Sequence, residues 1–177
     1  MKGQDVVILL KLVSLEQSEP DPRAYPVRAL ADSLHVSKSE VSASLNRSLF
    51  SGLATRSSAS GKVMPNRRYL FDFIVNGLKF VFPVRPGPLV RGVATAFAAP
   101  PLKGLLISAG EHIQVWPYAG GSGLGSSVEP LFASVPQAVE SDARLYAYLA
   151  LVDAIRIGNQ REAGVARDTL SEWMLGR

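Results

Sequence analysis

Residues 27–56, VRALADSLHVSKSEVSASLNRSLFSGLATR, decide the predicted fold. They contain two amphipathic helices connected by a tight turn. The first helix begins at Pro26, because proline is well tolerated in a first helical turn. The second begins after Ser37, whose hydroxyl can accept the Glu40 amide while the Glu40 carboxylate reaches back, as in a capping box. Gly52 ends this second helix. The stretch therefore predicts a helix, a turn and a second helix.

The apolar spacing fits two helices that cross closely. A small residue, Ala31, lies where the second helix needs room to cross the first. Apolar residues surround this point, namely Leu30, Leu34, Val36, Val41 and Leu45. The turn position that is often glycine is His35, and histidine tolerates a positive φ better than most residues. On these residues alone, a helical hairpin with no role in nucleic-acid binding stays an alternative.

Elements on either side extend this unit. Residues 5–16 are apolar on nearly all sides, which favours a buried helix, with a strand as the alternative. Residues 53–64 predict a β-hairpin with a polar tip. Asn66 can cap a further helix over residues 67–76, and the alternation in residues 78–82 predicts a strand.

The region 83–137 predicts little regular structure, because eight prolines interrupt it. Short strands are expected only near 105–108 and 112–116. The glycine-rich run 120–125 predicts a flexible loop rather than a phosphate-binding loop, because no Gly-Lys-Ser or Gly-Lys-Thr follows it.

A helical pair is predicted at the C-terminal end, over about 142–157 and 159–175, with Gly158 between the helices. Their expected inward residues are Leu145, Leu149, Val152, Ile155, Ala163, Ala166, Leu170 and Trp173. The two helices carry more apolar residues than a single core-facing stripe needs, which predicts packing against a second subunit. The alternative is that the surplus completes the core of the chain itself.

Positive charge is concentrated in one part of the chain. The net charge is +4, and residues 35–68 hold six basic residues against Glu40 alone. Residues 81–177 carry equal numbers of basic and acidic side chains. A basic cluster of this kind is what binding to a polyanion requires. A solvated basic face is the other interpretation.

The composition argues against several classes of function. The chain has no cysteine, and its two histidines, His35 and His112, are far apart in sequence. No metal site, cofactor site or catalytic constellation is therefore predicted, and the protein is not expected to be an enzyme. No apolar run reaches the roughly 20 residues of a membrane span. The N-terminus also lacks the features of a signal peptide, so we expect a cytoplasmic protein without a membrane partner.

Residues 5–64 resemble the winged helix-turn-helix domain of bacterial regulators of the MarR-like, IclR-like and GntR-like class. The resemblance is carried by ALADSLHVSKSEVSASLNRSLFSGL, residues 29–53, with its helix, turn, serine-capped helix, Gly-Leu pair and strand. It implies that the helix after Ser37 enters the major groove of double-stranded DNA. The side chains assigned to DNA by this resemblance are Ser37, Lys38, Ser39, Ser42, Asn46, Arg47, Arg56, Lys62, Arg67 and Arg68. Arg67 and Arg68 could equally be solvent-exposed residues of a first helical turn that do not contact DNA.

The predicted fold class is α+β, with an N-terminal winged helix-turn-helix, an irregular, strand-containing middle and a C-terminal helical pair. Residues 1–82 are expected to form the DNA-binding domain, and residues 83–177 a C-terminal interaction or dimerisation region. The predicted function is that of a sequence-specific transcriptional regulator, acting as a homodimer on palindromic DNA.

Two alternatives keep this fold but change its role. One is an antitoxin-like or accessory DNA-binding protein whose C-terminal half binds a partner protein. The other is a winged helix that serves protein contacts or RNA. If about six basic groups contact phosphates, the logarithm of DNA affinity should fall with the logarithm of salt concentration with a slope of about five.

Overall fold

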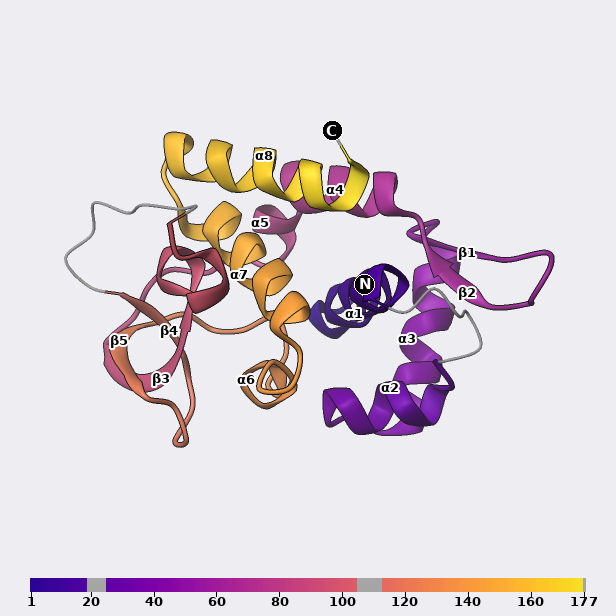
Figure 1. The fold of residues 1–177 in the computed structure, drawn as a ribbon, viewed down its shortest axis with the longest axis horizontal. Coiled ribbons are helices and arrows are strands. Elements are labelled where there is room, and N and C mark those ends of the chain that lie inside the picture. Colours follow the sequence, from indigo (N-terminus) through magenta and orange to yellow (C-terminus); the bar gives the residue numbers. More distant parts are fainter. Residues whose placement is uncertain (19–24, 105–112, 177) are drawn as a thin grey trace.

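The computed structural model describes residues 1–18, 25–104 and 113–176. Within these ranges the fold is mixed α+β and ends in a helical pair, as predicted (Figure 1). The elements in chain order are α1 (Gly3–Ser18), α2 (Val27–Leu34), α3 (Lys38–Phe50), β1 (Ala54–Arg56), β2 (Val63–Pro65), α4 (Arg67–Asn76), α5 (Leu78–Val81), β3 (Leu89–Thr95), the 3₁₀ turns η2 (Ala96–Ala98) and η3 (Pro100–Leu102), β4 (Gln114–Pro117), β5 (Gly123–Ser127), α6 (Val135–Ala138), α7 (Ala143–Ile157) and α8 (Gln160–Leu175).

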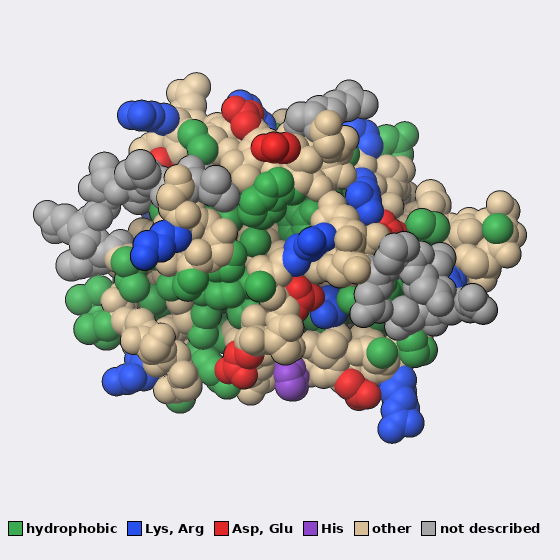
Figure 2. Space-filling view, viewed as in Figure 1, with side chains coloured by type: hydrophobic (Ala, Val, Ile, Leu, Met, Phe, Trp, Pro, Cys, Tyr) green, Lys and Arg blue, Asp and Glu red, His purple; other side chains and the backbone are tan. Residues whose placement is uncertain are grey.

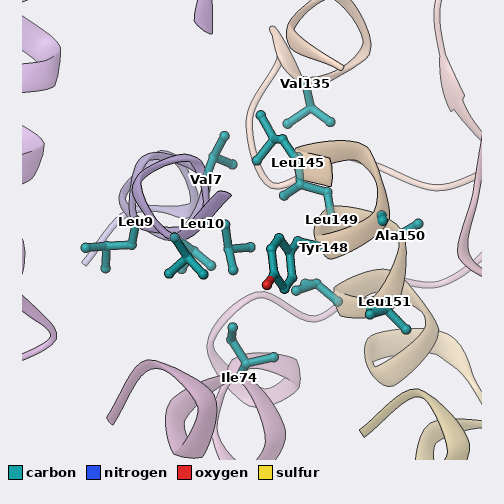
Figure 3. Packing of buried hydrophobic residues seen from close by; sticks show 14 of the residues in the cluster. Val7, Leu9, Leu10, Ile74, Val135, Leu145, Tyr148, Leu149, Ala150 and Leu151 are labelled. Atoms are coloured by element: carbon teal, nitrogen blue, oxygen red, sulfur yellow. The ribbon is translucent and has the colours of Figure 1, made fainter. Parts of the chain in front are cut away.

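Helix α1 lies at the centre of the fold. Its residues from Gln4 to Ser14 are buried, which confirms the helix predicted from a sequence that is apolar on nearly all sides. It packs against α3 on one side and against α7 on the other (Figure 1). Figure 3 shows Leu10 of α1 beside Tyr148 of α7, with Ile74 of α4 on a further side of the same core. One hydrophobic cluster therefore extends through both parts of the chain, and the division at residue 82 stays a prediction.

The predicted pair of helices and the hairpin are present in the first part of the chain. Helices α2 and α3 meet at His35, whose backbone is left-handed with φ of 54°. Ala31 is only 3% exposed, as a close helix crossing requires. Strands β1 and β2 pair antiparallel, with Thr55 opposite Met64. Asn66 accepts a hydrogen bond from the Tyr69 amide and caps α4, as predicted.

The middle region contains more β-structure than the sequence predicts. Strand β3 pairs antiparallel with both β4 and β5, and a short parallel pairing of β4 with β5 closes the three strands on one another. The prediction of a flexible loop over the glycine-rich run 120–125 is therefore wrong in its second half, because residues 123–125 are the start of β5. A Cβ atom at Gly92, Gly121 or Gly125 would collide with backbone atoms of the neighbouring segment. These glycines let the strands approach closely enough to close.

Two further predictions concern short strands. The prediction of a strand over residues 78–82 is wrong, because Leu78–Val81 form the helical turn α5. Leu78 is fully buried while Phe80 is 73% exposed, whereas residues two positions apart in a strand would share one face. The Phe82 amide donates to the Leu78 carbonyl, which is a helical hydrogen bond. The strand expected near 112–116 corresponds to β4. The one expected at 105–108 lies outside the described residues.

The C-terminal pair α7 and α8 is confirmed, and Gly158 separates the two helices as predicted. In helix α7, Leu145 and all residues from Ala147 to Ile155 are buried by the rest of the same chain. The surplus of apolar residues on α7 therefore completes the core of the chain, and it no longer argues for a second subunit. The homodimer stays a prediction that rests on the resemblance alone.

An ion pair at Asp142 and hydrogen bonds to Asp153 connect α7 to the rest of the fold. The Lys11 ammonium of α1 lies 2.8 Å from the Asp142 carboxylate, which also caps α7. Near the other end of α7, Asp153 is 2% exposed. Its carboxylate accepts hydrogen bonds from the Thr95 hydroxyl, the Trp116 indole and the Arg156 guanidinium. Because Thr95 belongs to β3 and Trp116 to β4, Asp153 fastens the closed strands to α7.

Across the described ranges, no helix combines the length and the apolar character needed to cross a membrane.

Candidate nucleic-acid interface

Helix α3 presents a polar stripe to solvent. Lys38, Ser39, Ser42 and Asn46 are all exposed, whereas Val41 on the opposite side is fully buried. Spacings of three and four residues place Ser39, Ser42 and Asn46 along one line of the helix. The side chains assigned to DNA on this helix are therefore accessible, with the exception of Arg47.

The start of α3 is held by its cap and by α1. The Glu40 amide donates to the Ser37 hydroxyl at 3.2 Å, as the capping pattern predicts. The Glu40 carboxylate, however, accepts a hydrogen bond from Gln4 of α1 instead of taking the reciprocal position in a capping box. The Ser37 and Ser39 hydroxyls lie 2.9 Å apart. This first turn of α3 thus faces solvent while α1 fixes its position.

Arg47 points away from the polar stripe and into the protein. Its guanidinium donates to both carboxylate oxygens of Asp5, with the shortest N–O distance at 2.7 Å. The Asp5 side chain is 0% exposed and that of Arg47 is 28% exposed. Arg47 therefore anchors α3 to α1, and the structure does not place it beside the other residues assigned to DNA.

The hairpin supplies two basic residues beside α3. The Arg56 guanidinium donates to the Gly61 carbonyl across the hairpin at 2.9 Å. The Lys62 ammonium nitrogen is buried and has no hydrogen-bond partner among the described residues. The Ser57 amide donates to the Lys62 carbonyl at 2.7 Å, which closes the tip between them.

Four of the residues assigned to DNA line one cleft. Ser42 and Asn46 of α3, and Arg56 and Lys62 of the hairpin, surround a cavity of about 430 Å³. Residues from distant positions in the sequence thus meet at the junction of α3 and the hairpin. This is where a major-groove helix and the adjoining hairpin of the predicted domain would both contact a duplex.

The two arginines of α4 are arranged differently. Arg67 donates to the Glu16 carboxylate of α1, with the closer nitrogen at 2.8 Å. Arg68 pairs with Asp72 one helical turn further along α4, and both side chains are exposed. Neither arginine lines the cleft.

The basic residues do not form a single patch on the face shown in Figure 2, where Lys and Arg side chains lie scattered among other residues. Ion pairing within the chain explains part of this, since Asp5 and Glu16 neutralise Arg47 and Arg67. Charge counting along the sequence cannot anticipate such pairing, because both acidic partners belong to α1.

Phe50, at the end of α3, is 97% exposed and is not among the residues predicted from the sequence to contact DNA. It lies four residues after Asn46 and eight after Ser42, so it continues the exposed stripe. That spacing was the available signal. A fully exposed aromatic ring on this line could contact a thymine methyl group or a sugar.

Acid is expected to weaken the fold through Asp5 and Asp142. Burial raises the pKa of each carboxyl, but hydrogen bonds to Asp5 from Arg47 and the Lys2 amide, and to Asp142 from the Leu145 amide and Lys11, outweigh it and hold both pKa values below the ordinary 3.8. As pH falls, the unfolded chain then binds protons first. The stability from these pairs is intact above about pH 5 and is lost progressively below it.

Urea unfolding of the wild type and of Asp5→Asn, followed from about pH 6 down to about pH 3, measures this contribution. The free energy of unfolding should fall more steeply with acid in the wild type. Equal slopes for the two proteins would contradict the prediction. Burial raises the pKa of Asp153, so this residue makes the folded protein relatively more stable as pH falls. Both proteins contain Asp153, so its contribution cancels in the comparison.

In the described part of the chain, no group of three or more His, Asp or Glu side chains is arranged to hold a metal ion. Comparison of the sequence with protein-family models, with curated proteins and with solved structures finds no match.

Proposed function

We propose that this protein is a sequence-specific DNA-binding transcriptional regulator whose residues 1–82 act as a winged helix-turn-helix. The observation that carries the proposal is the exposed polar stripe of α3 beside a hairpin with two basic residues. A helix that reads bases needs short polar side chains on its outer face and cations beside it for phosphates.

The proposed contacts follow the chemistry of each side chain. Asn46 can donate to and accept from an adenine edge in the major groove, and Ser42 is small enough to let the helix approach the bases. Lys38 at the start of α3 and Arg56 on the hairpin supply phosphate contacts, and Lys62 joins them by turning its ammonium, which is buried in the free protein, toward the DNA. Ser37 and Ser39 complete the contact set, while Arg47, Arg67 and Arg68 are left out because carboxylates engage them.

Because fewer of the basic residues lack a carboxylate partner among the described residues, a moderate salt dependence is predicted. With Lys38, Arg56 and Lys62 as the phosphate contacts, the log–log slope of affinity against salt should have a magnitude of about three rather than about five. Titration of a labelled duplex at several salt concentrations measures the slope. A slope near zero would contradict DNA binding. A slope of magnitude near five would indicate that Arg47 and Arg67 also contact phosphates.

Base reading by α3 is tested with Asn46→Ala. This variant should lose roughly 1–3 kcal/mol of discrimination at one base pair while its binding to unrelated sequences changes little. Asn76→Ala is the matched control, since Asn76 is exposed on α4 and its side chain donates to the Asp72 carbonyl of the same helix. A sequence preference that survives in Asn46→Ala would place the reading face on a different line of α3.

Sequencing of the genomic fragments that the purified protein retains tests the proposal as a whole. An enriched motif supports sequence-specific recognition, and a palindromic motif supports the proposed dimer, because a twofold dimer reads two related half-sites. Retention of fragments without any shared motif would exclude sequence-specific regulation.

A further inference from the structure

The cleft between α2, α3 and the hairpin has the size and lining of a small-molecule site. Its volume of about 430 Å³ lies within the usual range for ligand pockets. Half of the lining residues are aliphatic, among them Leu12 of α1, Leu30 of α2 and Leu45 of α3. A ligand with an aliphatic body would exclude water from this surface and gain free energy in proportion to the area covered.

The charged groups of the cleft have one sign. Arg56 and Lys62 line it, and no Asp or Glu is found among its described lining residues. The Lys62 ammonium nitrogen is buried without a hydrogen-bond partner in the described part of the chain. A buried ammonium without an acceptor is costly, so a rotation of the flexible Lys62 side chain that brings its nitrogen to an anion in the cleft would be favourable.

The N-terminus of α2 adds a third positive element. Pro26 and Val27 line the cleft, and no side chain in the described ranges caps this end of the helix. The free amide groups of a first helical turn carry partial positive charge and favour anions. The cleft thus offers one ammonium, one guanidinium and a helix N-terminus around an aliphatic surface.

We propose that this cleft binds a small organic anion with an aliphatic body, of the class of branched-chain or medium-chain monocarboxylates, and that the bound anion displaces DNA. The carboxylate meets Lys62 and Arg56, and the hydrocarbon covers the leucine surface. Displacement follows because Ser42 and Asn46 line the cleft and also belong to the DNA-reading stripe. The displacement rests on the proposed function, whereas anion binding does not.

Calorimetric titration of the full chain with hexanoate and octanoate tests the binding. Hexanamide, the neutral analogue of hexanoate, should bind about tenfold more weakly or worse. Lys62→Met, which keeps the apolar stem and removes the charge, should weaken hexanoate binding about tenfold, and Arg56→Gln should act in the same direction. Lys79→Met on α5, outside the cleft, is the matched control and should leave binding unchanged. Circular dichroism of each variant verifies folding.

Two results would overturn the anion site: no binding of either carboxylate at millimolar concentration, or equal binding of hexanoate and hexanamide that Lys62→Met leaves unaltered. The displacement is measured by adding saturating hexanoate to the protein on a retained DNA fragment. Release supports it, and continued binding overturns it. A protein that binds hexanoate but never binds DNA would remove the proposed function and leave the anion site standing.

Discussion

Asp153→Ala is expected to lower the free energy of unfolding by about 3–5 kcal/mol, the usual cost of breaking one side of a buried ion pair. The Asp153 and Arg156 side chains are 3% and 4% exposed, so water cannot replace the lost carboxylate without opening the core. Among the described residues, the Arg156 guanidinium would keep only the Phe82 and Glu129 carbonyls as acceptors. The Thr95 hydroxyl and the Trp116 indole would also lose their acceptor.

Urea unfolding followed by tryptophan fluorescence measures this loss. Asp168→Ala is the matched control, because Asp168 also pairs with an arginine, Arg167, but its side chain is 77% exposed. An exposed pair contributes about 0–1 kcal/mol, so the control should unfold almost as the wild type does. Equal effects of the two substitutions would mean that Asp153 does not fasten the closed strands to α7.

The first part of the chain could be predicted from sequence because its signals are local. Ser37 and Asn66 cap the helices that follow them, and His35 takes the left-handed conformation required by the turn. The outward face of α3 follows from helical periodicity once Val41 is known to be buried. Each of these inferences uses residues only a few positions apart.

The middle region could not be predicted because its structure depends on distant pairing. Strand β3 pairs with β5, so Arg91 lies opposite Leu124, and no local pattern encodes that register. Glycine has no side chain to reveal a burial pattern, so Gly121 and Gly125 resemble a loop in sequence and serve a close strand contact in the fold.

The contrast between local signals and distant pairing also explains which residues of the candidate site could be predicted. The exposure of Ser42 and Asn46 follows from their own helix, and the structure agrees with it. The pairing of Arg47 depends on which residue of α1 faces it, and that residue, Asp5, is 42 positions away. A basic residue can be assigned to a surface from sequence only when no buried carboxylate competes for it.

Arg47→Met is expected to destabilise the fold by about 3 kcal/mol without altering the salt dependence of DNA binding. The fully buried Asp5 carboxylate would lose its charged partner and keep the Lys2 amide at 2.7 Å. An unpaired buried charge accounts for most of such a loss. Adding Asp5→Asn should recover part of the stability, because the double variant buries no unpaired charge, and a double-mutant cycle measures the coupling between the two residues.

The salt dependence of DNA binding distinguishes a residue that anchors α3 to α1 from a residue that contacts DNA. At a temperature at which both variants are folded, Arg47→Met should keep the salt slope of the wild type, whereas Lys62→Met should reduce its magnitude by about one, the change expected when one phosphate contact is lost. If Arg47→Met instead reduced the slope by one and unfolded as the wild type does, Arg47 would be the DNA contact that the resemblance implies. Its pairing with Asp5 would then have to open when DNA binds.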